Sequence, residues 1–262
     1  MQSQSIIKYI NQWMKNYAET AKSKGFVVGV SGGIDSAVTS TLAAETGLSI
    51  LCIEMPIHQD SDQISRAQEH IAWLKTKYCN VKSANIELTN VFDSFVDTIP
   101  KMDDSENRLR SLVNTRARLR MTTLYYFAQI HNYLVAGTGN KVEDFGIGFY
   151  TKYGDGGVDL SPIADLMKTE VFDIGKELGI CQRILDASPT DGLWNDNRTD
   201  EDQIGATYPE LEWAMTFKGD ENNLTNREQE ILDIYRSFNQ ANKHKMIPIP
   251  VCKIPKNLNS IN

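Results

Sequence analysis

The chain has 262 residues, of which 41% are hydrophobic, so it can bury the core of one α/β domain of ordinary to large size. Its 34 acidic residues outnumber its 27 Lys and Arg residues and give a formal net charge of -7, which disfavours a nucleic-acid partner held by a general basic surface. The N-terminus lacks the apolar core of a signal peptide and no segment approaches the length of a membrane span, so we expect a cytoplasmic protein with no membrane partner.

Helical patterns and apolar runs alternate along the first half of the chain. An amphipathic helix opens the sequence and ends near Gly25. The elements expected after it are a strand at 26–30, a helix at 36–47, a strand at 48–55, a helix at 61–78, a strand at 81–88, a short helix at 90–99, a long helix at 105–132 and a strand at 133–139. Strands that are nearly continuous in apolar residues and alternate with helices favour an α/β fold with a parallel sheet covered by helices on both faces.

The last third of the chain is predicted to be helical. Helical patterns cover 165–179, 208–217 and 226–245, and the polar stretch 188–203 interrupts them. Because the sequence contains no internal repeat and no low-complexity tract, we expect a single domain that spans residues 1–262.

A glycine-rich turn joins the strand at 26–30 to the helix after it. Residues 27–38 read VVGVSGGIDSAV, and adjacent glycines can adopt positive φ and direct several backbone N–H groups toward one anion. The turn matches neither GxxxxGK[ST] nor GxGxxG. Taken alone, it fits equally well a turn in which Asp35 or Ser36 only caps the helix. A second glycine turn follows Ala136, and ligands bind beyond the carboxyl ends of such strands, so both turns are expected to face one crevice.

The segment SGGIDS at 31–36 resembles the signature of the N-type ATP pyrophosphatases, or PP-loop family. In that family the loop holds the pyrophosphate released when ATP is cut between its α and β phosphates. The resemblance implies a Rossmann-like fold of the adenine-nucleotide alpha-hydrolase kind. It also implies that a substrate oxygen is adenylated and that a nitrogen nucleophile then displaces AMP.

Further segments narrow the resemblance to the ammonia-dependent NAD synthetases. The sequence GTGNKVEDFGIGFYTKYGDGGVDLSPIADLMKTEVF at 137–172 is similar to a segment of that family, with GT, a Glu, TKYGDGG and a Lys in the same order. The segments ARLRM at 117–121, SPTDGLW at 188–194 and KHK at 243–245 match the remaining family motifs in order and with similar spacing.

The resemblance implies a role for each matching residue. Implied contacts to ATP are Gly29, Val30, Ser31, Gly32, Gly33, Ile34, Asp35, Ser36, Thr138, Lys168 and Thr190. Implied ligands of Mg²⁺ are Asp35 and Glu143, and implied contacts to deamido-NAD are Arg118, Lys152, Asp159, His244 and Lys245. The family also implies a homodimer with deamido-NAD near the subunit interface.

The residue types alone leave plainer alternatives open. Glu143 fits a solvated acid in a first helical turn, and Arg118 fits the wet face of a helix. Lys168 fits an ion pair with a neighbouring acid, Thr190 fits a helix cap, and His244 fits a surface residue that offsets a helix dipole.

Three glycines surround Asp155 in KYGDGG and predict a flexible loop that can act as a lid. Ammonium must be bound as a cation and deprotonated before it can attack, and a carboxylate in a closing loop suits both tasks. We therefore hypothesise that Asp155 is the catalytic residue. The alternative is a surface turn with an ordinary Asp.

The resemblance implies one activity, the ATP-dependent amidation of deamido-NAD to NAD with ammonia through an adenylated intermediate, with release of AMP and pyrophosphate. The chain has no room for an amidase domain, so we expect it to use free ammonia or ammonia from a separate partner. A PP-loop enzyme of another substrate class, such as a tRNA-lysidine or GMP synthetase, is the main alternative. A nucleotide-sensing module is a second alternative, disfavoured because a sensor does not need a pyrophosphate site.

Overall fold

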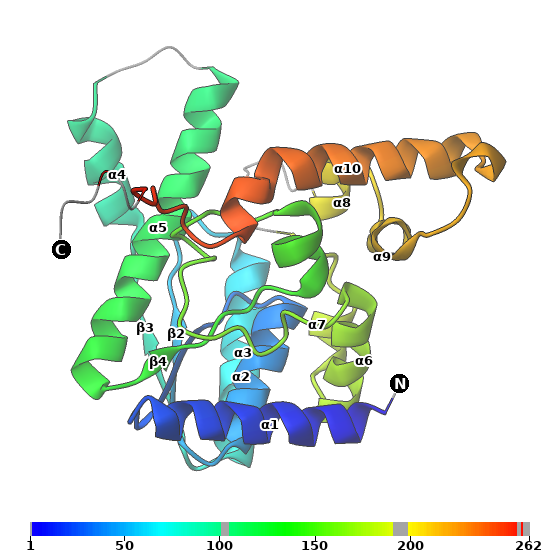
Figure 1. The fold of residues 1–262 in the computed structure, drawn as a ribbon. Coiled ribbons are helices and arrows are strands. Elements are labelled where there is room, and N and C mark those ends of the chain that lie inside the picture. Colours follow the sequence, from blue (N-terminus) through cyan, green and yellow to red (C-terminus); the bar gives the residue numbers. More distant parts are fainter. Residues whose placement is uncertain (1, 101–104, 191–198, 256–257, 259–262) are drawn as a thin grey trace.

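Four parallel strands form the centre of the fold, in the spatial order β3-β2-β1-β4 (Figure 1). The strands are β1 (Gly25–Gly29), β2 (Ser49–Glu54), β3 (Val81–Asn85) and β4 (Leu134–Val135). The structure is a computed structural model that describes residues 2–100, 105–190, 199–255 and 258. The parallel pairing of all four strands confirms the predicted sheet.

Helices cover both faces of this sheet, as the sequence predicts. The first face carries α1 (Ser3–Thr20), α2 (Ile34–Glu45), α3 (Ser61–Lys77) and α6 (Lys168–Leu178), and the second carries α4 (Thr89–Thr98) and α5 (Glu106–His131). Successive side chains of a strand point to opposite faces. In β1, Phe26 and Val28 accordingly join the apolar cluster of the first face, and Val27 joins that of the second.

The C-terminal third forms a helical layer of its own. Its elements are α8 (Asp200–Ile204), α9 (Tyr208–Thr216), a 3-10 turn η2 (Glu221–Asn223) and α10 (Asn226–Met246), whereas the short α7 (Gln182–Leu185) before them packs through Ile184 in the cluster of the first face. A π-helical turn η1 (Val142–Ile147) lies beneath these helices, and its buried Val142 and Ile147 pack in one cluster with Leu211 of α9 and Ile231 of α10. In Figure 1, α10 runs across the molecule at the end opposite to α1. The segment η1 therefore connects the helical layer to the carboxyl ends of the strands.

Side-chain caps fix where several helices begin. Asp60 accepts hydrogen bonds from two backbone N–H groups at the start of α3, and Ser105 accepts one at the start of α5. Thr225 and Glu228 form a reciprocal capping box at the start of α10. Such local signals explain why the observed starts lie close to the predicted ones.

Three strands are shorter than predicted, and β2 loses only one residue at each end of the expected 48–55. The strand expected at 133–139 is β4, which pairs with β1 only at Leu134 and Val135. Beyond Val135, Ala136 N still donates to Val27 O of β1 at 3.0 Å, but Ala136 also forms a parallel bridge with Leu160, and Gly137 packs against Val158. The strand expected at 81–88 ends at Asn85.

The region from 140 to 168 also departs from the prediction. The π-helical turn η1 was not predicted, because nothing in its local pattern distinguishes it from a loop. The helix expected from residue 165 begins at Lys168. No described helix is long and apolar enough to cross a membrane.

Candidate active site

The turn between β1 and α2 brings the start of a helix to the carboxyl ends of the strands. Ser36 closes the turn, since its Oγ accepts a hydrogen bond from Ser31 N at 3.2 Å and donates one to Gly33 O at 3.0 Å. The first N–H groups of a helix have no intrahelical partner and favour an anion. The turn therefore has the geometry of the phosphate site that the sequence predicts.

Gly32 makes the tight approach of this turn to α3 possible. Its φ is +83°, and a Cβ at this position would lie 2.4 Å from the carbonyl oxygen of Gln63. Gly47 has a similar φ of +76°, but a Cβ there would meet no atom within 4 Å. The two glycines therefore differ in what surrounds them and share the same backbone conformation.

We expect Gly32→Ala to lower the free energy of unfolding more than Gly47→Ala does. The left-handed conformation alone costs about 1 kcal/mol for alanine, and the clash with Gln63 raises the loss at Gly32 to about 3 kcal/mol. Urea unfolding of both variants measures the difference, and the KM for ATP should rise only in Gly32→Ala. Equal losses of stability with an unchanged KM would show that the contact with α3 does not shape the turn.

Three charged side chains from distant parts of the chain meet behind the turn. Lys168 Nζ donates to Asp35 Oδ2 at 2.6 Å and to Glu143 Oε1 at 2.9 Å. The Lys168 side chain is 3% exposed, and those of Asp35 and Glu143 are 18% and 16% exposed. Glu143 is thus not a solvated acid, and Lys168 pairs with these two distant carboxylates, whereas its neighbour Asp165 pairs with Lys141.

Neutral donors complete the cluster. The hydroxyl of Tyr208 donates to Glu143 Oε1 at 2.6 Å, and the Lys168 ammonium lies 4.7 Å from the centre of the Tyr208 ring. Asn140 is fully buried, and its Nδ2 donates to Asp35 Oδ1 at 3.1 Å while its Oδ1 accepts from the backbone N–H of Glu143 at 3.1 Å. Asn140 thereby connects the Asp35 carboxylate to the backbone of Glu143.

Burial and charge act against each other in this cluster. Burial alone would lower the pKa of Lys168, but the carboxylates of Asp35 and Glu143 outweigh it and raise that pKa. Burial would raise the pKa of Glu143, but Lys168 and Tyr208 hold it below its usual value. For Asp35 burial prevails over Lys168 and raises the pKa. Two carboxylates beside one ammonium carry net negative charge, so a further cation is favoured at this place.

The oxygen ligands of the cluster fit Mg²⁺. This ion is usually held by one or two carboxylates together with substrate phosphates and water. Asp35 and Glu143 provide the two carboxylates next to the phosphate-binding turn. Across the described ranges, no three acidic, His or Cys side chains form a complete protein site for a metal ion. A magnesium ion here would accordingly be shared with substrate phosphates.

A cavity of about 280 Å³ lies next to the cluster. The predicted residues in its wall are Gly29, Val30, Ser31, Gly33, Ile34, Asp35, Ser36, Thr138, Glu143, Asp155, Lys168 and Thr190. Gly32 lies behind the turn, against α3. The structure thus gathers the residues predicted for ATP and magnesium around one space.

Asp155 reaches this cavity from the loop after η1. Thr151 N donates to Asp155 Oδ1 at 2.9 Å, so the carboxylate closes a tight turn of the loop. The residue is exposed to water in the cavity, yet the protein packed around its carboxyl partly excludes water and raises the pKa of Asp155 to about 6. A carboxyl group with this pKa is a suitable proton acceptor near neutral pH.

The residues predicted to contact deamido-NAD lie outside that cavity wall. Three of them meet at Lys152, whose backbone carbonyl accepts from Arg118 Nη2 at 3.3 Å and whose Nζ donates to His244 O at 2.9 Å. Lys245 Nζ donates to the carbonyl oxygens of Gly148 and Tyr150. Arg118 and His244 are exposed. Their contact with deamido-NAD stays a prediction.

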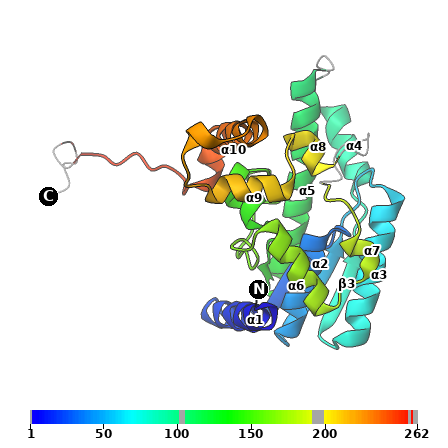
Figure 2. The ribbon, with the colours of Figure 1, turned by 90° about the vertical axis from the view of Figure 1, so that its right-hand side faces the viewer.

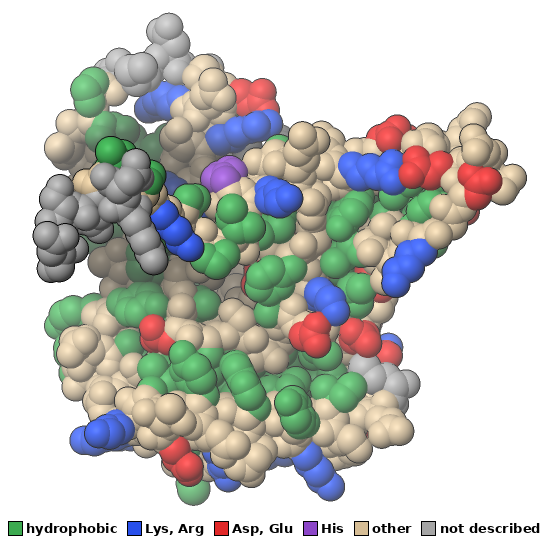
Figure 3. Space-filling model, in the orientation of Figure 1, with side chains coloured by type: hydrophobic (Ala, Val, Ile, Leu, Met, Phe, Trp, Pro, Cys, Tyr) green, Lys and Arg blue, Asp and Glu red, His purple; other side chains and the backbone are tan. Residues whose placement is uncertain are grey.

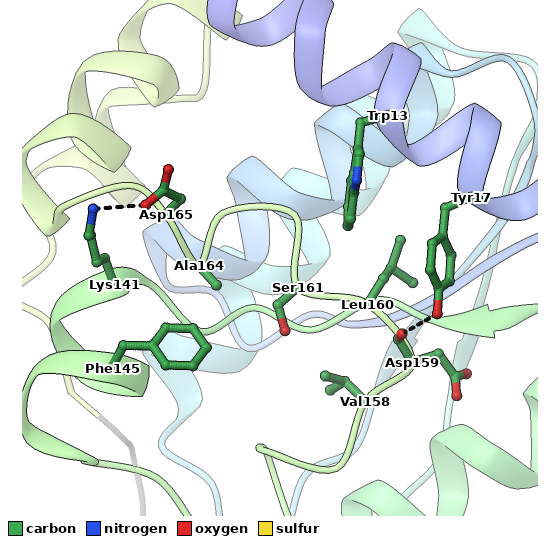
Figure 4. Close-up of a pocket in the computed structure, with 10 residues that line it drawn as sticks. All are labelled: Trp13, Tyr17, Lys141, Phe145, Val158, Asp159, Leu160, Ser161, Ala164 and Asp165. Atoms are coloured by element: carbon green, nitrogen blue, oxygen red, sulfur yellow. Dashed lines mark hydrogen bonds and ion pairs between the residues drawn. The ribbon is translucent and has the colours of Figure 1, made fainter. Parts of the chain in front are cut away.

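Asp159 lies in a separate, more open groove of about 580 Å³ (Figure 4). Its carboxylate accepts from Val135 N at 2.8 Å and from the Tyr125 hydroxyl at 3.1 Å. Trp13 and Tyr17 of α1 and Phe145 of η1 also line the groove. Figure 3 shows hydrophobic side chains gathered on the face of the molecule where α1 lies.

Sequence reasoning missed several residues of the two sites. Asn140 lies inside the GTGN segment, but only its fold position shows that it connects the Asp35 carboxylate to the backbone of Glu143. Tyr208 had no sequence signal beyond the capping box that starts α9. Arg66 and Arg120 line the cavity and bring positive charge to it, with hydrogen bonds to backbone carbonyls of Gly32 and Met55.

Comparison with known proteins agrees with this geometry. A model of the family described as NAD synthase matches residues 6–248. The chain belongs to the NAD synthase family. It is 36% identical over 228 residues to the NH(3)-dependent NAD(+) synthetase of Mesoplasma florum, covering 87% of this chain and 90% of the relative. Identity to the corresponding Carboxydothermus hydrogenoformans protein is 35% over 245 residues, with 91% and 92% covered.

Solved structures of the NAD synthase family and its neighbours have the same fold. The NMN synthetase of Francisella tularensis aligns with a TM-score of 0.84 at 30% identity, covering 98% of this chain and 99% of that chain. The NH3-dependent NAD synthetase of Campylobacter jejuni aligns with a TM-score of 0.76 at 25% identity, covering 97% and 100%. The family and the Rossmann-like PP-loop fold predicted from the motifs are therefore confirmed.

Proposed function

We propose that this member of the NAD synthase family is a cytoplasmic ligase that converts deamido-NAD to NAD with ATP and ammonia and releases AMP and pyrophosphate. The observation that carries the proposal is the position of Lys168 between Asp35 and Glu143 at the SGGIDS turn, in contact with the cavity that Asp155 also lines. The cytoplasm supplies the ATP that the reaction consumes.

The first step activates the nicotinate carboxylate. A carboxylate is a poor electrophile, so its oxygen attacks the α-phosphorus of ATP, the bond to the β-phosphate oxygen breaks, and pyrophosphate leaves. The N-terminal turn of α2 and Lys168 bind and orient the departing phosphates, and positioning together with charge stabilisation provides the acceleration. Asp35 and Glu143 would hold Mg²⁺, which would offset the negative charge of the phosphates.

The second step forms the amide. Ammonia attacks the carbonyl carbon of the mixed anhydride, AMP leaves with the electron pair of the broken C–O bond, and the nitrogen loses its extra proton to solvent. Asp155 binds the incoming ammonium and accepts its proton, which frees the nitrogen lone pair for attack. The loop that carries Asp155 helps to exclude water, because water would hydrolyse the anhydride.

A homodimer is part of the proposal. The groove of Asp159 exposes aromatic side chains of α1, and the chain beyond α10 exposes Ile249, Val251 and Ile254. Figure 2 shows that this C-terminal segment extends away from the body on the side where α1 lies. A second copy facing that side would cover both apolar surfaces. Light scattering of the purified protein tests this, and a monomer at micromolar concentration would contradict it.

A second candidate substrate is the deamido mononucleotide. The specific observation in its favour is the likeness to the Francisella tularensis NMN synthetase, with a TM-score of 0.84 over 98% of this chain. Both substrates present the same nicotinate carboxylate, so both fit the chemistry described above. They differ in the adenylate half, which only the dinucleotide contains.

One assay tests the proposed function and separates the two substrates. The purified protein is incubated with ATP, Mg²⁺ and ammonium, and with either deamido-NAD or nicotinate mononucleotide. We expect NAD and AMP from the dinucleotide, with a larger kcat/KM than for the mononucleotide. A reversed preference favours the second candidate, and the formation of ADP excludes the proposed bond cleavage.

A further inference from the structure

Three side chains on one face of α10 bind successive backbone carbonyls of the segment that leads to Asp155. Asn239 Nδ2 donates to Gly146 O at 2.7 Å, and Asn242 Nδ2 donates to Ile147 O at 2.9 Å. Lys245 Nζ donates to Gly148 O and, at 2.7 Å, to Tyr150 O. The three residues repeat every three positions, a spacing that places them on one side of a helix. We call Asn239, Asn242 and Lys245 the α10 ladder.

The α10 ladder binds groups that the local backbone leaves without partners. The last carbonyls of a helical segment have no intrahelical donor, and η1 ends at Ile147. The chain turns at Gly148, where φ is +64° and a Cβ would lie 2.4 Å from Asn242 Cβ. The backbone is therefore pressed directly against α10, and the ladder fixes its position.

The fixed segment lies between two residues of the proposed mechanism. Glu143 belongs to η1 itself, three residues before the first bound carbonyl, and Asp155 follows Tyr150 by five residues. The ammonium of Lys245 also lies 4.9 Å from the centre of the Tyr150 ring, so it holds this residue by both backbone and side chain. A shift of α10 would consequently move both carboxylates.

We propose that the α10 ladder consists of positioning residues, in which Lys245 sets the loop of Asp155 and Asn242 sets η1 and Glu143. This inference rests on the proposed function, because it assigns Glu143 to adenylate formation and Asp155 to the ammonia step. It gives Lys245 a role inside the protein that differs from the contact to deamido-NAD predicted from the sequence. In the structure its ammonium already binds two carbonyl oxygens.

The two half-reactions separate the roles of the ladder residues. Pyrophosphate exchange into ATP in the absence of ammonia reports adenylate formation, and NAD formation reports the complete reaction. We expect Lys245→Met to lower the rate of amide formation about tenfold to a hundredfold, with pyrophosphate exchange and the KM for deamido-NAD unchanged. Asn242→Ala is expected to lower the rate of pyrophosphate exchange itself.

Two further variants serve as rescue and control. Lys245→Arg should restore part of the lost rate of amide formation. Lys243 is an exposed lysine on the same helix, so Lys243→Met is the matched control.

The pH profile gives a readout that a purely structural role would not change. The charged groups that face Asp155 are Glu143 from η1, Asp144 beside it and Lys245 from α10. Burial raises the pKa of Asp155, and Lys245 acts in the opposite direction. Lys245→Met should therefore move the acid limb of the rate of amide formation to higher pH. The proposal would be overturned if the rate of Lys245→Met fell at the same pH as that of the wild type while its KM for deamido-NAD rose. That result would show that Lys245 contacts the substrate.

Hydrogen–deuterium exchange tests the ladder without any activity. Backbone amides of residues 146–155 should exchange faster in Lys245→Met than in the wild type, and those of β1 and α2 should not. Unchanged exchange at 146–155 refutes the ladder even if the enzyme is fully active. Faster exchange in a protein that makes no amide from either nucleotide refutes the proposed function and leaves the contact of Lys245 with the loop established.

Discussion

Asp35→Asn is expected to lower kcat for NAD formation about a thousandfold, the scale of losing a preorganised charge contact to the transition state. The substitution keeps the size of the side chain but removes the charge that pairs with Lys168 at 2.6 Å. It also removes one of the two proposed magnesium ligands. Steady-state assays at saturating ATP and Mg²⁺ measure the loss.

The control for this experiment is Asp165→Asn. Asp165 pairs with Lys141 at 2.8 Å, but its side chain is 97% exposed, so the same chemical change should have little effect on kcat. Thermal unfolding of both variants shows whether the Asp35 variant is folded. A folded Asp35→Asn enzyme with the wild-type rate would remove the basis of the proposed phosphate and magnesium site.

Asp155→Asn is expected to lower NAD formation about a hundredfold to ten-thousandfold, the usual contribution of a positioned general base. Pyrophosphate exchange should persist, because adenylate formation does not need this carboxylate. Exposed Asp173→Asn is the matched control, since Asp173 forms only a weak pair with Lys176 at 3.5 Å. If the rates of pyrophosphate exchange and of amide formation fell equally, Asp155 would act in adenylate formation instead.

The wild-type pH profile tests the same assignment. A general base acts in its deprotonated form, and burial raises the pKa of Asp155 to about 6. The rate of amide formation should therefore be full well above this pH and fall as the pH drops through about 6. In Asp155→Asn this limb should be absent. An acid limb near 4, the ordinary value for an aspartate, would contradict the role of Asp155 as the base.

The sequence predicted the order of strands and helices well, because each signal is local. An apolar run such as 26–30 and a cap such as Thr225 act within a few residues. The shortening of β4 could not be predicted in this way. Beyond Val135 the chain forms a bridge with Leu160, a residue distant in the sequence that no local signal connects to Ala136.

In the candidate site, too, local motifs predicted some features and contacts between distant residues determined the others. Asp35 and Lys168 are 133 positions apart, and only the resemblance of their surrounding motifs suggested that they act together. Tyr208 and Asn140 complete the cluster through contacts that exist only in the folded chain. Arg118 and His244 meet at Lys152 while Asp159 lies in another groove, and only the resemblance assigned these residues to one substrate.

The arrangement of Lys168 has a consequence for the order in which ligands enter. Its ammonium is paired with Asp35 and Glu143, so a phosphate would not meet an unpaired lysine. A bare triphosphate would have to compete with both carboxylates for the same proton-bearing nitrogen and would be repelled by them. A triphosphate complexed to a divalent cation would instead give the carboxylates a replacement counterion and release the lysine. The proposed site would therefore discriminate by the charge state of the incoming nucleotide before any chemistry begins.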